Sequence, residues 1–276
     1  MMELLLGKPS ADRIKEDIKN RISSFNRSPK MMVLMNEEDS SSVGYVNAQI
    51  KVGASLGIEV VVKTMKSSEE EYIDEIERIN KDDSIDACMI TRPLFKGANE
   101  LSIFSHISPS KDVDCMNPLS LGDLFVGKKD SLAPATSRAI IEMVKDNNIE
   151  VEGKNVLVIG RSISVGKPAA MLLLNMNATV TIAHSKTKNL DDLLLQADIV
   201  VASIGKQEFI DAKKCKDGVI ILDAGIHYLE DKIVGDVKLS DNIGKITKVP
   251  GGVGSVTSAC LMDNVTTLYE RRNGRK

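Results

Sequence analysis

Residues 155–166 read NVLVIGRSISVG, an apolar run that meets a glycine and continues through a polar turn to a second glycine. A strand that leads directly into a glycine turn and then a helix is the context in which such a loop cradles a dinucleotide. The helix N–H groups that follow the turn would face a pyrophosphate. The glycines are six residues apart, which departs from G-x-G-x-x-G, so an ordinary strand-to-helix turn stays an alternative. The candidate cofactor residues of this loop are Gly160, Ser164, Val165, Gly166 and Pro168.

The chain on either side of this loop alternates between apolar strands and helical segments. Runs such as TVTIAH, DIVVAS and GVIILDAG have strand character, and the segments between them have the length of crossover helices. This alternation predicts a parallel sheet of the Rossmann type. The predicted strands are residues 155–160, 179–184, 198–203 and 218–225, and the predicted helices are residues 136–148, 165–175, 190–196 and 256–271.

The N-terminal part of the chain carries a second alternating pattern. Apolar residues recur at helical spacing behind Ser10, which predicts a first helix over 10–25. Three strand-like runs separated by two helical segments then indicate a parallel βαβαβ unit. The predicted strands are residues 31–35, 58–62 and 86–90, with helices over 43–56 and 68–80. The irregular stretch 109–134 predicts a domain boundary, and two α/β domains are therefore expected.

The end of the second Rossmann strand decides between NAD and NADP. NAD sites place a carboxylate there, whereas this strand ends in His184, Ser185 and Lys186. No carboxylate follows until Asp191, and Arg161 adds a cation beside the glycine loop. Because a 2′-phosphate is attracted by guanidinium and hydroxyl donors, NADP fits better than NAD. The alternative is that His184 and Lys186 merely solvate the end of a strand.

A second glycine-rich segment, VPGGVGS over 249–255, is the other candidate for cofactor contact. Glycines at Gly251 and Gly252 let backbone lie against a flat ligand without obstruction by side chains. Taken by itself, the segment could equally be a mobile turn.

The overall composition excludes several classes of protein. The 276 residues carry a formal charge of −3, and only nine are aromatic, with no Trp. A polynucleotide partner usually needs a basic field and aromatic stacking platforms, so it is not expected. No apolar run approaches the roughly 18–20 residues of a membrane helix, and the N terminus lacks a signal-peptide pattern, so we expect a cytoplasmic protein without a membrane partner. The four cysteines never form C-x-x-C, and no metal site is predicted.

Taken in order, the segments GRSISVGKPAAMLLL, TVTIAHSKT, ILDAGI, GDV and PGGVGSVTSA closely resemble the methylenetetrahydrofolate dehydrogenase/cyclohydrolase family. The resemblance runs over residues 1–272, essentially the whole chain. It implies an N-terminal three-layer βαβ domain and an NAD(P)-binding Rossmann domain, with a folate cleft between them, assembled as a homodimer through the Rossmann domains. It places residues 1–132 and 256–276 in the folate-binding catalytic domain and residues 133–255 in the NADP-binding domain.

The same resemblance implies an activity and a set of site residues. The family oxidises 5,10-methylenetetrahydrofolate with NADP and hydrolyses the 5,10-methenyl product to 10-formyltetrahydrofolate. By analogy Arg161 and Ser185 hold the 2′-phosphate, and Asp114 binds the pterin. The residues expected to shape the dinucleotide and nicotinamide sites are Ser162, Ser164, Val165, Gly166, Pro168, Asp223 to Ile226 and Gly251 to Gly254.

The folate half departs from the family pattern. A family helix carries Tyr and, four residues later, a catalytic Lys, whereas here Tyr45 is followed at that spacing by Gln49. Thr91 replaces the glutamine that assists the lysine, and Cys115 replaces the glycine that usually follows the aspartate Asp114. We place Tyr45, Gln49 and Asp114 at the substrate site.

These departures affect the two reactions differently. Hydride removal leaves a cation already delocalised between N5 and N10, so no side chain must take a proton in that step. Hydrolysis needs a titratable group, worth about 10²–10⁴ in rate, and Gln49 cannot shuttle a proton. The sequence therefore predicts a competent NADP-dependent dehydrogenase with a weak or absent cyclohydrolase. An NADP-linked oxidoreductase acting on a modified pterin carrier and a catalytically silent nucleotide-binding module stay open as alternatives.

Overall fold

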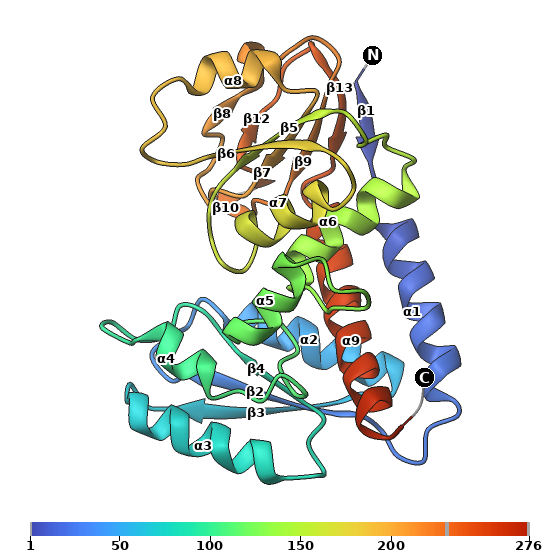
Figure 1. Ribbon diagram of the computed structural model, residues 1–276, viewed down its shortest axis with the longest axis vertical. Coiled ribbons are helices and arrows are strands. Elements are labelled where there is room, and N and C mark those ends of the chain that lie inside the picture. Colours follow the sequence, from blue (N-terminus) through green and yellow to red (C-terminus); the bar gives the residue numbers. More distant parts are fainter. Residues whose placement is uncertain (1, 230–231, 275–276) are drawn as a thin grey trace. The chain divides into compact units, whose positions relative to one another are not determined.

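The structure is a computed structural model that describes residues 2–229 and 232–274 (Figure 1). The chain forms two compact units. The first, which we call the Rossmann unit, comprises the N-terminal residues as far as Asp12, Leu124–Lys129 and Pro134–Cys260. The second, which we call the three-stranded unit, comprises Arg13–Asp123, Asp130–Ala133 and the residues from Leu261 onward.

A six-stranded sheet forms the centre of the Rossmann unit, and every neighbouring pair in it is parallel. Strands buried on both faces read as continuous apolar runs, as β5 and β7 do. In spatial order the strands are β1 (Glu3–Leu5), β13 (Ile243–Thr247), β9 (Val219–Asp223), β7 (Ile199–Ala202), β5 (Asn155–Ile159) and β6 (Thr179–Ala183).

Crossover helices place the carboxyl ends of β5 and β7 at a switch in strand order. Helix α7 (Gly166–Leu174) leads from β5 outward to the edge strand β6, and α8 (Leu190–Gln196) returns across β5 to β7. Right-handed crossovers in opposite directions put these helices on opposite faces of the sheet. In open parallel sheets, ligands bind outside the carboxyl ends of the strands at such a switch.

Short elements complete the Rossmann unit. Helix α6 (Ala135–Asp146) precedes β5, and the 3-10 helix η1 (Ala212–Lys214) follows β8 (Ile210–Asp211), which pairs with β12 (Val237–Lys238). Strands β10 (His227–Leu229) and β11 (Lys232–Val234) pair antiparallel.

The three-stranded unit contains a parallel sheet in the order β3-β2-β4, in which β2 (Lys30–Asn36) lies between β3 (Glu59–Met65) and β4 (Ala87–Ile90). Helix α2 (Val43–Leu56) packs closely on β3, because a Cβ at Gly53 would lie only 2.7 Å from Cγ2 of Val60. Figure 1 shows α3 (Glu69–Lys81) on the other face of the sheet. The unit also holds α4 (Glu100–Ser105) and most of α5 (Pro118–Phe125).

Two long helices, α1 (Lys8–Ile22) and α9 (Val253–Arg272), are joined by charged side chains within the three-stranded unit. Arg21 of α1 forms ion pairs with Asp263 at 2.5 Å and Glu270 at 2.6 Å. Asn264 donates from its amide to the carbonyl oxygens of Val113 and Ala133. The ion pairs of Arg21 are charge-assisted and fix the register of α1 on α9.

The structure confirms the predicted α/β class and both parallel sheets, and it corrects several elements. Helix α1 begins at Lys8 and ends at Ile22, so the predicted range 10–25 is shifted, because Pro9 suits a first helical turn and the N–H of Ala11 already bonds to the carbonyl of Gly7. The stretch 109–134, predicted to be irregular, contains α5. Strands β1 and β13 were not predicted.

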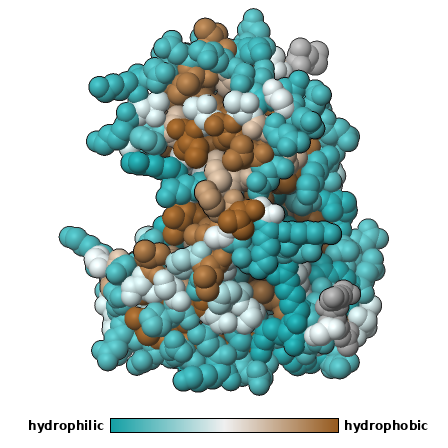
Figure 2. Space-filling model, viewed as in Figure 1, coloured by the Kyte–Doolittle hydropathy of each residue, from teal (hydrophilic) through white to brown (hydrophobic). Residues whose placement is uncertain are grey.

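The described surface is mainly hydrophilic, with apolar patches (Figure 2). Large exposed apolar side chains on the Rossmann unit include Leu174, Leu195 and Tyr228. Within residues 2–229 and 232–274, no helix combines the length and the apolar composition that a membrane span requires.

Candidate active site

Two glycines shape the predicted dinucleotide loop after β5. Gly160 has φ +132°, and a Cβ there would lie 2.3 Å from the carbonyl oxygen of Ser203, which follows β7. A Cβ on Gly166 would lie 2.3 Å from the carbonyl oxygen of Gly160 itself. The loop therefore closes on itself and on the end of β7 at the switch point, and only glycine fits at either position.

Ser162 organises the start of helix α7. Its hydroxyl oxygen accepts the N–H groups of Val165 at 3.1 Å and Gly166 at 3.3 Å. Pro168 lies in the first helical turn and is buried. Ser164 and Val165 are half-buried and Arg161 is exposed, so the loop presents polar groups beside a helix N terminus, which favours an anionic ligand.

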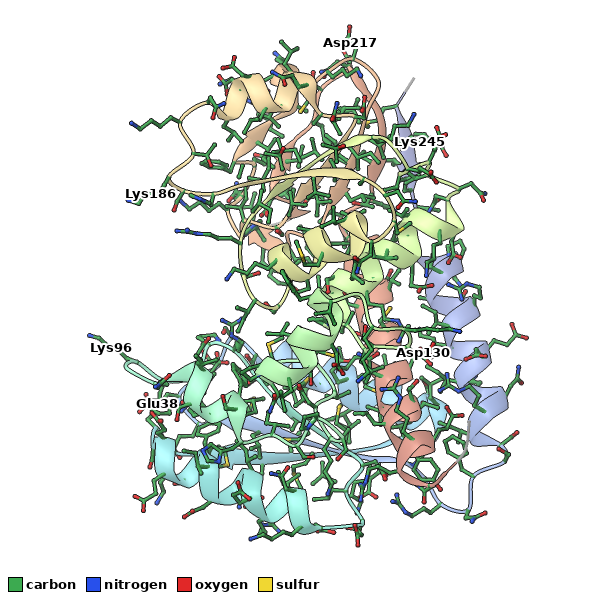
Figure 3. All side chains as sticks on the ribbon, in the orientation of Figure 1. Glu38, Lys96, Asp130, Lys186, Asp217 and Lys245 are labelled. Atoms are coloured by element: carbon green, nitrogen blue, oxygen red, sulfur yellow. The ribbon has the colours of Figure 1, made fainter. Side chains whose placement is uncertain are left out.

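The end of β6 lies beside the same loop, because the N–H of Gly160 donates to the carbonyl of Ala183 at 2.9 Å. His184 and Ser185 follow directly, so the predicted 2′-phosphate residues share one edge of the sheet with Arg161. Nδ1 of His184 accepts the N–H of Lys186 at 3.1 Å, which leaves Nε2 to carry the proton of the neutral ring. Figure 3 shows the side chain of Lys186 extending away from this loop.

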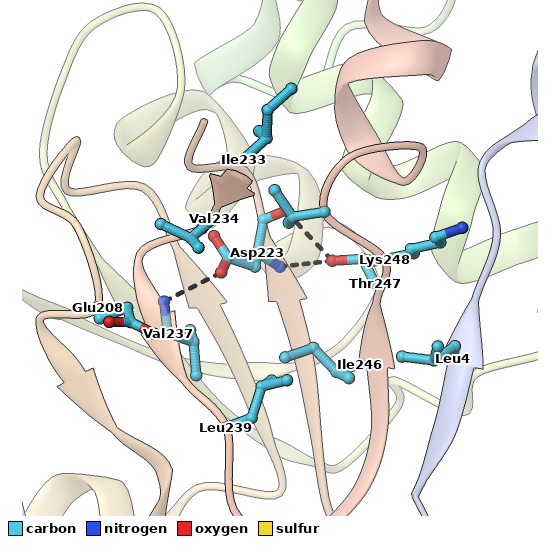
Figure 4. Close-up of a pocket in the computed structure, with 12 residues that line it drawn as sticks. Leu4, Glu208, Asp223, Ile233, Val234, Val237, Leu239, Ile246, Thr247 and Lys248 are labelled. Atoms are coloured by element: carbon cyan, nitrogen blue, oxygen red, sulfur yellow. Dashed lines mark hydrogen bonds between the residues drawn. The ribbon is translucent and has the colours of Figure 1, made fainter. Parts of the chain in front are cut away.

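The predicted nicotinamide segment is anchored by Asp223, which is buried at the end of β9. Its carboxylate accepts the N–H groups of Gly225 at 2.8 Å, Asp236 at 3.1 Å and Val237 at 3.1 Å. Its own N–H donates to the hydroxyl of Thr247 at 2.8 Å (Figure 4). Burial raises the pKa of the Asp223 carboxyl to about 6.

A cavity of about 280 Å³ lies beside Asp223 (Figure 4). Apolar side chains provide most of its wall, among them Ile233, Val237 and Ile246. The cavity lies within the Rossmann unit and touches the end of β13, from which the glycine-rich segment continues.

The glycine-rich segment 249–255 is held against the N terminus of the chain. Gly251 has φ +103° and accepts the N–H of Gly7 at 2.8 Å, and a Cβ on Gly252 would lie 2.5 Å from the carbonyl oxygen of Lys248. A Cβ on Gly254 would lie 2.9 Å from Cδ1 of Ile226, whose side chain is half exposed. The structure thus brings together Ile226 and the glycine-rich segment, the two parts of the chain assigned to the nicotinamide in the sequence analysis.

The predicted folate residues come together at the carboxyl edge of the three-stranded sheet. Tyr45 lies in the first turn of α2, and the hydroxyl of Ser42 contacts the carbonyl of Arg92 at 3.4 Å, which places this turn beside the segment after β4. Thr91 comes first in that segment, and its N–H donates to the carbonyl of Leu34 at 3.0 Å.

Asp114 reaches the same edge from a segment that runs beside β4. Cys88 and Asp112 form a parallel bridge, so Asp114 leaves the sheet where β4 ends. Burial raises the pKa of the Tyr45 hydroxyl above its ordinary range, and the negative charge of Asp114 raises it further. Tyr45 and Asp114 thus come from two segments that meet at the same edge of this sheet.

A tight turn presents Asp114. The buried carboxylate of Asp112 accepts the N–H groups of Met116 at 2.9 Å and Asn117 at 2.8 Å. Cys115, at φ +54°, takes the left-handed conformation that favours glycine, so the backbone keeps the shape that a glycine after Asp114 would adopt.

Gln49 lies one turn beyond Tyr45 on α2, and its residue is 0% exposed. Thr91 is also buried, and its hydroxyl oxygen has no hydrogen-bond partner among the described residues. Gln49 and Thr91, which replace the family's lysine and glutamine, are therefore both buried side chains of the three-stranded unit.

Sequence reasoning missed several residues that hold these sites. Gly7 supports the glycine-rich segment, Ser203 closes on Gly160, and Asp236 bonds the loop after β7. The GDV motif that contains Asp236 was the only available signal, and it pointed to the family without assigning a role.

Comparisons with known proteins match both the N-terminal and the C-terminal part of the chain. The family profile described as tetrahydrofolate dehydrogenase/cyclohydrolase, catalytic domain, matches residues 5–114, and its NAD(P)-binding domain profile matches residues 134–273. The bifunctional protein FolD of Clostridium kluyveri is 42% identical, with 98% of each chain covered, and that of Caldanaerobacter subterraneus is 40% identical, with 96% of this chain and 95% of the relative covered.

Solved structures show the same similarity. The FolD dehydrogenase/cyclohydrolase of Campylobacter jejuni has a TM-score of 0.94 at 34% identity and covers 99% of this chain and 100% of its own. The FolD of Trypanosoma brucei, complexed with NADP cofactor and inhibitor, has a TM-score of 0.91 at 28% identity, with 98% of each chain covered.

Proposed function

The chain belongs to the tetrahydrofolate dehydrogenase/cyclohydrolase family, and from that premise we propose how its two units divide the reaction. The protein is an NADP-dependent enzyme that oxidises 5,10-methylenetetrahydrofolate to 5,10-methenyltetrahydrofolate. In this proposal the Rossmann unit binds NADP and the three-stranded unit binds the folate.

The residues after β5 fit a dinucleotide. A Cβ at Gly160 or Gly166 would collide with nearby backbone atoms. The absence of side chains at these two positions allows a pyrophosphate to approach the backbone closely. When bound, NADP supplies the hydride acceptor. Arg161 and Ser185 bind its 2′-phosphate, with His184 at the same strand end, and no carboxylate there opposes that charge. Ile226, Gly251 and Gly252 flank the nicotinamide.

The folate is held by Asp114 and Tyr45. Asp114 accepts hydrogen bonds from pterin N–H groups, and the rigid turn set by Asp112 aims its carboxylate. Tyr45 lines the site beside it. Hydride loss from the methylene carbon leaves a cation shared by N5 and N10. These residues therefore need only orient the substrate for hydride transfer.

The single observation that supports a weak cyclohydrolase is the buried pair Gln49 and Thr91. Gln49 occupies the helix position one turn from Tyr45, and neither an amide nor a hydroxyl there takes up or releases a proton near neutral pH. Water attack on the methenyl carbon and opening at N5 both require proton transfer. We therefore infer that the enzyme releases methenyltetrahydrofolate largely unhydrolysed.

A two-stage assay tests this proposal. Enzyme, methylenetetrahydrofolate and NADP are mixed, and the formation of NADPH and of the methenyl chromophore is followed. Decay of the chromophore is then compared with an enzyme-free sample. We expect rapid formation and decay at the spontaneous rate. Rapid enzyme-dependent decay would contradict the loss of hydrolysis, and no NADPH formation would contradict the dehydrogenase.

We also propose a homodimer through the Rossmann unit. Strand β6 is the last strand of the sheet, and Thr181 and Ile182 on it are exposed. An exposed edge strand favours pairing with a second copy across a two-fold axis. Light scattering should give a dimer mass for the native protein and a monomer mass for Ile182→Lys, whose charges would repel across such an axis. An unchanged mass would contradict this interface.

A cytoplasmic location is part of the same proposal. All four cysteines are buried and none forms a disulfide, which is usual in reducing compartments. Cell fractionation with a specific antibody tests it.

A further inference from the structure

Asp236 is a fully buried carboxylate that joins three segments of the Rossmann unit. Its Oδ2 accepts the N–H groups of Ile204 at 2.7 Å and Gly205 at 3.0 Å, and its Oδ1 accepts that of Lys206 at 3.0 Å. Three consecutive backbone donors on one carboxylate fix the loop that follows β7. Ser203, at the start of that loop, is the residue against which Gly160 closes.

The nicotinamide segment reaches the same carboxylate. Oδ1 of Asp236 would lie 2.4 Å from a Cβ on Gly225, so this glycine lies directly against it. The N–H of Asp236 in turn donates to Asp223, where the segment begins. Asp236 therefore lies between the loop after β7 and residues 223–226.

His227 makes the remaining side-chain bond to this carboxylate. Its Nε2 lies 2.8 Å from Oδ1 of Asp236, and because a carboxylate only accepts, Nε2 is the donor. The His227 side chain is 20% exposed and that of Asp236 is 0% exposed, so this bond is largely shielded from water. His227 directly follows Ile226 and begins β10.

From this arrangement we propose that His227 is a positioning residue for hydride transfer. The bond from Nε2 to Asp236 holds the end of the nicotinamide segment to the loop that supports the dinucleotide. The bond thereby fixes the position of Ile226 relative to the Gly160 loop. This matters because a small change in the distance between the hydride donor and acceptor carbons lowers the rate of transfer strongly. The inference rests on the proposed function, because it assigns the nicotinamide to Ile226.

Two substitutions separate the hydrogen bond from the bulk of the ring. His227→Leu keeps similar volume and removes the donor, while His227→Gln places an amide N–H near the position of Nε2. The matched control is His106→Leu, because His106 forms an exposed pair with Glu77 at 3.2 Å in the other unit. Each protein is assayed for kcat, for both KM values, for NADP affinity by calorimetry and for the isotope effect with dideuterated methylenetetrahydrofolate.

For His227→Leu we expect kcat to fall at least tenfold, with a larger isotope effect and with NADP affinity and the KM for folate within about threefold of the native values. His227→Gln should restore most of kcat, and His106→Leu should match the native enzyme. An unchanged kcat and isotope effect in His227→Leu overturns the proposal, and so does equal impairment of the Leu and Gln variants.

Folding and the proposed function are tested separately. If His227→Leu does not fold, His227→Ala replaces it, and failure of both to fold overturns the proposal by making the contact a requirement of the fold. An inactive native enzyme would contradict the dehydrogenase itself, whereas an active native enzyme with an unaffected His227→Leu variant contradicts only the positioning role.

Discussion

A Cβ placed on Gly166 would lie 2.3 Å from the carbonyl oxygen of Gly160. The relationship joins the first residue of α7 to the last residue before the polar turn, six positions earlier. No side chain can be accommodated at Gly166 without moving the loop that we assign to NADP.

Gly166→Ala is therefore expected to weaken NADP binding. Displacement of the loop should raise the KM for NADP at least tenfold, which corresponds to about 1.4 kcal/mol, with a smaller change in the KM for folate. Gly122→Ala is the control, because a Cβ there meets nothing within 4 Å beyond its own helix backbone and its chain neighbours. Alanine also stabilises a helix by about 1 kcal/mol relative to glycine. Equal NADP affinity in the two variants would show that the loop does not hold the cofactor.

Cys115 provides a test of the turn that presents Asp114. Replacement by Gly removes a left-handed strain of about 1–2 kcal/mol but also a buried thiol worth about 1 kcal/mol, so urea unfolding should change little. Cys115→Val puts a β-branched side chain at φ +54° and should destabilise the protein and raise the KM for methylenetetrahydrofolate. If Cys115→Val binds folate as the native protein does, the turn does not position Asp114.

Restoring the family residues should restore hydrolysis. The double variant Gln49→Lys with Thr91→Gln introduces a titratable amine beside the helix turn of Tyr45, and we expect methenyl decay to accelerate at least tenfold over the native enzyme. The control is Gln49→Met with Thr91→Gln. Methionine is similar in length to the introduced lysine but has no ionisable group, so this variant should leave the methenyl decay unchanged. A folded, oxidising Lys variant without faster decay would locate the defect elsewhere.

The raised pKa of Asp223 predicts a pH dependence of stability. A carboxyl with an unfolded pKa of 3.8 and a folded pKa of about 6 binds more protons when folded, so its contribution to the unfolding free energy falls as the pH rises from about 4 to about 6. The fall amounts to about 3 kcal/mol. Asp223→Asn removes this titration, so its stability deficit relative to the native protein should shrink over that window. Urea unfolding at pH 4.5 and 7.5 measures it, and a constant deficit would refute the raised pKa.

Helices and strands could be predicted where the residues that specify them lie within one short segment of the sequence. Helix α2 has the predicted bounds because its apolar face and terminal Gly57 lie within one short segment. Strand β1 was not predictable, because three residues carry no periodicity and its pairing partner, β13, lies more than two hundred positions away. Helix α5 was not predicted, because Pro118 and Gly122 within eight residues are typical of a loop.

The sequence by itself determined the family, the two α/β patterns and the loss of a titratable group at Gln49, since each is carried by the identity of residues in contiguous motifs. Only the tertiary structure decided which distant residues support those motifs. Gly7 holds Gly251, Asp236 bonds the loop after β7 and His227, and Asp112 shapes the turn that presents Asp114 at the edge of the three-stranded sheet. Such contacts join segments far apart in the chain, and they depend on the strand order that brings the carboxyl ends of parallel strands to one edge.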